Sequence, residues 1–109
     1  MNLAMNPAMT PNAIMFTLIA GQALEAELVD ALSELAEYPL MLVSNLRGHN
    51  DTHRSLSVAE QVEGTLPLVR LSLHTDEATA LKLIDYLRDH FQCAGIRWWS
   101  TPISTGLIE

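Results

Sequence analysis

The chain has few cysteines and few basic residues. Cys93 is its one cysteine, so no internal disulfide can form, which fits a reducing compartment. Six Lys and Arg stand against 13 Asp and Glu, giving a net charge of −7, and none of the six precedes Arg47. Because binding to phosphate backbones needs clustered cations, this composition argues against nucleic acid as a partner.

Long hydrophobic runs and catalytic motifs are missing as well. The apolar run 14–20 is too short for a signal or membrane helix, and no basic residues precede it. We therefore expect a cytoplasmic protein without direct membrane insertion. No G-x-S-x-G, Cys–His motif or glycine-rich phosphate loop is present, so we expect no enzyme activity.

The residues that are present predict one domain over 14–109, after a flexible leader at 1–13 that is rich in Met, Asn and Pro. Hydrophobic residues make up 49% of the chain, which is enough for a core. Alternating and helical periodicities predict six elements. They are strands at 14–20, 40–47, 66–74 and 96–103, and helices at 22–36 and, capped by Thr75, up to about 91.

This order predicts an α+β, ferredoxin-like fold, a split βαβ-βαβ with an antiparallel four-stranded sheet and two helices on one face. The other face keeps apolar side chains, either Met15 and Ile19 or Leu68 and one tryptophan, depending on strand phase. Uncovered apolar patches usually mark interfaces, so we expect a symmetric homo-oligomer.

A long polar segment, 48–65, separates the second and third strands. Ser57 and Glu60 fit a capping box, which predicts a helical turn over 58–62. Long loops inside small domains are usually functional or disordered, and an internal helix cap favours function.

Two histidines in this segment, His49 and His53, have H-x-x-x-H spacing, and Asp51 lies between them. Neutral imidazoles with a carboxylate suit divalent transition metals such as Zn, Ni, Co or Cu. The alternative is two exposed, solvated histidines, and the sequence alone favours it because the pair is predicted in a loop, where this spacing does not place both side chains on one face.

Four arginines, Arg47, Arg54, Arg70 and Arg97, belong to strands or to the base of the segment. Together they could form an anion pocket at a subunit junction, for a nucleotide or a carboxylate. Pairing with the many acidic residues is an equal alternative.

Three further side chains have a predicted place. Trp98 and Trp99 alternate across the sheet, so one is expected in the core and the other at an interface or a stacked ligand. Cys93 is expected to be a small buried filler.

Several phrases carry a family resemblance: Gly48-His49, His53-Arg54, the run from Leu56 to Gly64, and Gly95 to Trp99. With the element order, the chain resembles the PII-like signalling proteins. It is most similar to a subgroup known as a domain of unknown function, often found beside heavy-metal efflux pumps of the RND type.

The resemblance implies a homotrimer in which residues 48–65 form a long loop between the second and third strands, called the T-loop. It also favours metal sensing by His49 and His53. Gly48 would belong to a ligand site at the base of the loop. The segment 91–95 contains no lysine, unlike the nucleotide-binding turn of true PII proteins, so the resemblance does not carry ATP binding over.

Two hypotheses follow. In the first, a PII-like trimer senses a metal or small ligand through the T-loop and acts on a protein partner such as a membrane-transporter subunit. In the second, a trimer binds a nucleotide or carboxylate in clefts between its subunits, using Arg47, Gly48, Arg54 and Arg97.

Overall fold

The computed structural model describes residues 12–49 and 65–109, which form one sheet and two helices. The strands are β1 (Ala13–Gly21), β2 (Met41–Gly48), β3 (Leu66–Asp76) and β4 (Arg97–Pro102), and the helices are α1 (Glu25–Leu35) and α3 (Glu77–His90). A 3₁₀ turn, η2 (Gln22–Leu24), precedes α1. The predicted single helix over 22–36 is therefore a 3₁₀ turn followed by an α-helix.

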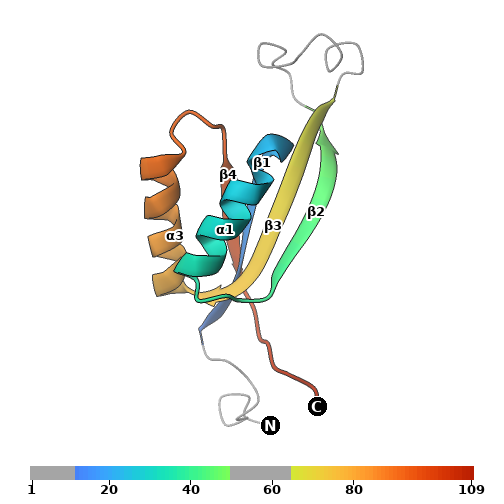
Figure 1. The fold of residues 1–109 in the computed structure, drawn as a ribbon. Helices are drawn as coiled ribbons and strands as arrows, with labels where there is room; N and C mark the ends of the chain where they lie inside the picture. The colour runs from blue at the N-terminus through green and yellow to red at the C-terminus, as the bar shows by residue number, and fades with distance from the viewer. Residues whose placement is uncertain (1–11, 50–64) are drawn as a thin grey trace.

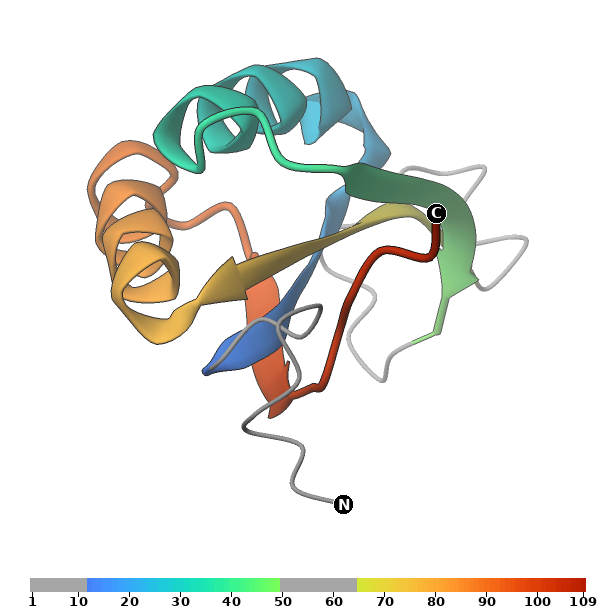
Figure 2. The ribbon, with the colours of Figure 1, turned by 90° about the horizontal axis from the view of Figure 1, so that it is seen from below.

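The sheet has the strand order β2-β3-β1-β4, and every neighbouring pair is antiparallel. Both helices lie on one side of it, and no helix covers the other side in the described part of the chain (Figures 1 and 2). This arrangement confirms the predicted ferredoxin-like α+β fold.

The core fills the space between the sheet and the helices. Phe16 and Leu18 of β1 are fully buried there, and each helix adds leucines, Leu28 and Leu32 from α1 and Leu83 from α3. Burying one such side chain is worth about 1.5–3 kcal/mol, so this layer is the main source of stability.

The helix ends follow local chemistry. After α1, Glu37 and Tyr38 adopt positive φ (60° and 59°), and Pro39 prevents the helix from continuing. At the start of α3, the Asp76 carboxylate accepts a hydrogen bond from the Thr79 backbone N–H at 2.7 Å. The predicted cap, Thr75, is wrong, because β3 continues through that residue to Asp76.

The side of the sheet away from the helices is called the open face here. Successive residues of a strand point to opposite faces of the sheet. Because Phe16 and Leu18 point to the helices, the residues of β1 that alternate with them, and their partners in the other strands, point to the open face. Its members in the paired strands are Met15, Thr17, Ile19, Gly21, Leu42, Ser44, Leu46, Gly48, Leu66, Leu68, Arg70, Ser72, His74, Arg97, Trp99 and Thr101.

Large apolar side chains remain accessible on the open face. Leu42 is 53% exposed and Trp99 is 44% exposed, while Met15, Ile19 and Leu68 are half-buried. Both apolar sets predicted from strand phase therefore occur on this one face. Between them Thr17 is buried, with its Oγ1 3.1 Å from Ser72 Oγ.

Candidate ligand-binding cleft

A cleft of about 690 Å³ lies at the end of the sheet where β2 stops and β3 begins. It is called the loop-base cleft here, and its walls come from four separate parts of the chain. They are Ile19 to Ala23 at the end of β1 and in η2, Gly48 and His49 at the end of β2, Leu66 to Leu68 in β3, and Ala94, Gly95, Arg97 and Trp99 around the start of β4. Its volume is in the range of small-molecule sites, about 300–1,000 Å³.

Three glycines contribute to the wall of the loop-base cleft. Gly21, Gly48 and Gly95 all line the cleft, so a ligand can approach the backbone closely there. At Gly48 the lack of a side chain is needed, because a Cβ atom would overlap Leu68 Cδ1 and lie 3.3 Å from Leu68 Cγ. Gly95 has a φ of +70°, which turns the chain from α3 into β4.

Arg97 provides the positive charge of the cleft. Its neighbour across the sheet is Ile19, whose other neighbour is Arg70, so the two arginines flank Ile19 on the open face. Two strand spacings separate their Cα atoms by about 10 Å. An anion at this edge of the cleft would therefore meet one guanidinium directly and a second nearby.

No acidic residue lines the cleft in the part of the chain that the structure describes. In residues 12–49 and 65–109, the one ion pair joins Arg88 to Asp85, so Arg47, Arg70 and Arg97 contact no carboxylate there. The alternative prediction, that these arginines are neutralised by nearby acids, does not hold in the described part of the chain. Within residues 12–49 and 65–109, no carboxylate therefore holds these guanidinium groups.

The predicted site residues are only partly brought together. Gly48, His49 and Arg97 line the cleft. Arg47 pairs with Pro67, which places it on the helix side of the sheet, and it does not line the cleft. His53 and Arg54 lie outside the described residues, as do Asp51, the capping box at Ser57 and the predicted turn over 58–62.

Of the two predicted metal ligands, His49 lies in the described part of the chain and His53 does not. His49 is exposed at the end of β2. No group of three or more His, Cys, Asp or Glu side chains that could hold a metal occurs within residues 12–49 and 65–109.

The two tryptophans alternate across the sheet as predicted, but the expectation that one of them lies in the core is wrong, because Trp98 and Trp99 are 45% and 44% exposed on the edge strand β4. Trp98 lies on the helix side and stacks on Phe16, with ring centroids 5.9 Å apart and an interplanar angle of 26°. Trp99 lies on the open face beside Thr17 and lines the loop-base cleft. Its indole offers a flat surface on which an aromatic ligand could stack.

The prediction for Cys93 is wrong. The residue is exposed, because it lies in the connection between α3 and β4 with a positive φ of 61°, outside the core.

Sequence reasoning missed the contributions of Gly21 and of Leu66 to Leu68 to the cleft. The sequence feature that could have identified Gly21 is its position directly after the predicted strand 14–20. No sequence feature could have identified the β3 residues, because their position at the cleft depends on the register between β2 and β3.

The fold matches those of solved PII-like proteins. CPII, a nitrogen regulatory PII-like protein from Thiomonas intermedia K12 bound to ADP, AMP and bicarbonate, has the same fold. Its TM-score is 0.69 at 16% identity, over 93% of this chain and 99% of that one. CutA from Synechococcus elongatus PCC7942 matches with a TM-score of 0.67 at 13% identity, over 96% and 89%.

A protein of the DUF3240 family from Shewanella baltica OS155 is more similar, with a TM-score of 0.71 at 20% identity, over 92% of this chain and all of that one. The profile of this family, described as protein of unknown function (DUF3240), matches residues 10–107. The chain belongs to the DUF3240 family. No curated protein sequence matches it. Within the described residues, no helix has the length and hydrophobicity to cross a membrane.

Proposed function

We propose that this protein is a non-enzymatic, PII-like regulator that works as a cytoplasmic homotrimer. Its subunits would associate through the open face of the sheet, which carries accessible Leu42 and Trp99. Burial of such patches drives association at about 25 cal/mol per Å² of apolar surface, before the cost of immobilising the partners.

The ligand that the loop-base cleft supports best is a small anion with a flat ring system, such as a nucleotide, together with a carboxylate-like anion. The observation that carries this proposal is the meeting of Arg97, Trp99 and Gly48 in one cleft, with no acidic side chain among the described residues that line it. Arg97 suits phosphate or carboxylate, and Trp99 suits the ring. The ADP, AMP and bicarbonate named for CPII agree with this chemistry.

The loop segment would report the occupancy of the cleft. Gly48 and His49 line the cleft and lead directly into residues 50–64. A ligand held there contacts the root of the segment, and Arg54 would add a further guanidinium. Ordering of one segment by a ligand is a known switching device.

A divalent transition metal is the second candidate ligand. His49 is exposed at the rim of the cleft, and His53 follows four residues later in the sequence. The two imidazoles would hold Zn²⁺ or a similar ion at the root of the T-loop. A partner such as a subunit of a heavy-metal efflux system would then read the state of the loop.

Calorimetric titration of the full chain with ADP, AMP, bicarbonate and Zn²⁺ separates these proposals. We expect ADP or AMP to bind, and Arg97→Gln to weaken that binding roughly tenfold, as loss of a charge-assisted hydrogen bond implies. Arg47→Gln is the matched control, because Arg47 lies on the other face. Nucleotide binding that Arg97→Gln leaves unchanged would remove this site.

A further inference from the structure

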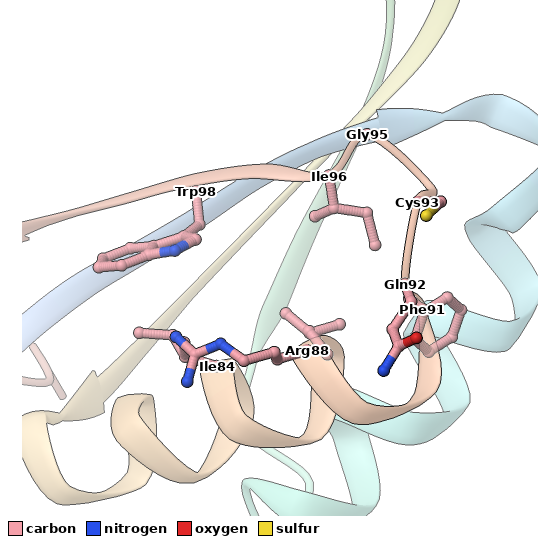
Figure 3. A pocket seen from close by; sticks show the side chains of 9 residues that line it. Ile84, Arg88, Phe91, Gln92, Cys93, Gly95, Ile96 and Trp98 are labelled. Atoms are coloured by element: carbon pink, nitrogen blue, oxygen red, sulfur yellow. The ribbon is translucent and has the colours of Figure 1, made fainter.

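A second hollow, separate in chemistry from the loop-base cleft, lies between α3 and β4. It has a volume of about 570 Å³ and is called the α3–β4 hollow here (Figure 3). Five apolar side chains line it: Ile84, Leu87, Phe91, Ile96 and Trp98. Such a volume with mostly apolar walls is typical of sites for small organic molecules.

The hollow exists because β4 is an edge strand. Trp98 points to the helix side, and its ring rests on the buried Phe16, yet 45% of Trp98 stays exposed. Ile84 of α3 and Ile96 before β4 are half-buried at the same place. In a single subunit this apolar surface is in contact with water, so binding of a ligand that covers it is favoured by the hydrophobic effect.

Two polar side chains stand at the hollow. Arg88 lies along the α3 side, with its guanidinium below the Trp98 ring, and Gln92 lies at the other end of the hollow (Figure 3). The Arg88 ion pair with Asp85 is 3.5 Å long, and both side chains are more than 70% exposed. Exposed pairs of this kind are worth little, so Arg88 can turn to an anion.

We propose that the α3–β4 hollow binds a small apolar anion, an aromatic or branched hydrocarbon with one acidic group. The hydrocarbon part packs between Trp98 and Ile84, and the acidic group pairs with Arg88. This ligand differs from that of the loop-base cleft, where Arg97 and the glycines favour a more polar molecule.

One thin wall separates the two sites. Ile96 and Trp98 line the hollow, Arg97 and Trp99 line the loop-base cleft, and Gly95 lines both. The two sites therefore share β4, whose alternate side chains line one hollow or the other.

The fluorescent anion anilinonaphthalene sulfonate (ANS) and its uncharged analogue N-phenylnaphthylamine test the site on the full chain. Arg88→Glu should weaken ANS binding roughly fivefold to tenfold and leave the analogue unchanged. Lys82→Glu makes the same charge change on an exposed position of α3 that does not line the hollow. Equal effects of the two variants on ANS, or none from Arg88→Glu, would overturn the proposed anion partner.

Cys93 locates the probe, because it lines the hollow and is the one cysteine of the chain. Bound ANS should slow alkylation of Cys93 by iodoacetamide at least severalfold. In the control, Cys93→Ser with Ser104→Cys, the exposed new thiol should react at an unchanged rate. Alkylation of Cys93 that saturating ANS does not slow would contradict the site, whether or not nucleotides bind in the loop-base cleft.

Discussion

Gly48 and Leu68 lie so close that the glycine has no room for a side chain. A Cβ atom on Gly48 would overlap the end of the Leu68 side chain, and both residues line the loop-base cleft. The end of β2 and the start of β3 are therefore held together at the point where the cleft opens. Space at this contact determines the shape of the proposed ligand site.

Gly48→Ala should narrow the loop-base cleft and reduce the stability of the fold only slightly. The new methyl group meets a flexible Leu68 end, which can move, so the loss of stability should be about 1 kcal/mol, at the low end for overpacking. The displaced side chain enters the cleft and should weaken nucleotide binding severalfold. Thermal unfolding and calorimetry measure the two effects.

Gly21→Ala is the control for loss of a glycine. Gly21 also lines the cleft, but its φ is −63° and no atom lies within 4 Å of an added Cβ. Its stability should stay equal or rise by about 0.4–1 kcal/mol. A larger loss of stability from Gly21→Ala than from Gly48→Ala would show that the Leu68 contact is unimportant.

Arg70→Gln should weaken anion binding less than Arg97→Gln does. Arg97 lines the cleft, whereas Arg70 reaches it only from the far side of Ile19. Because neither arginine contacts a carboxylate in the described residues, both variants should unfold at nearly the wild-type temperature. Equal weakening by both, or unfolding of either, would disprove this ranking.

The cap of α3 should make stability depend on pH in the acid range. Hydrogen bonds from Thr79 lower the pKa of Asp76 below its ordinary 3.8, with a smaller contribution from the Lys82 charge. A lowered pKa in the folded state stabilises the fold above pH 3.8, and this stability is lost as the pH falls through the folded-state pKa.

Asp76→Asn isolates this effect, because the amide oxygen still caps the helix but does not ionise. The variant should unfold at a lower temperature than wild type at pH 7, and the difference should disappear well below pH 3.8. A difference that persists unchanged at pH 2 would contradict the charge contribution, and Asp76→Ala should be the least stable variant at pH 7.

His49→Ala and His53→Ala test the metal proposal. If the two imidazoles share one ion, each variant alone should reduce Zn²⁺ affinity by at least tenfold. His74 in β3 and His90, whose Nδ1 lies 3.0 Å from the Tyr86 carbonyl oxygen, provide control substitutions. Zinc binding that survives removal of both His49 and His53 excludes them as the metal site.

The sequence predicted what depends on local pattern. Alternating and helical periodicities predicted four strands and two helices in the order that the structure shows. Thr75 and Asp76 are both good caps, and the choice between them depends on how far β3 pairs with β1, which the sequence does not reveal.

The sites depend on contacts between distant segments and could be predicted only in part. The sequence singled out Gly48, His49 and Arg97, but it could not bring Gly21 or Leu68 to them, because strand register decides that. The α3–β4 hollow was missed entirely. Its apolar side chains resemble ordinary core residues in the sequence, and only the edge position of β4 explains why 45% of Trp98 is exposed.

The mass of the protein in solution tests the central claim most directly, since the open face must bring subunits together for the regulator to work. Light scattering during size exclusion should give three times the 12.0 kDa of the chain. Leu42→Glu, on the open face, should dissociate it, whereas Leu81→Glu, 57% exposed on α3, should not. A wild-type protein of 12.0 kDa at micromolar concentration would contradict the account.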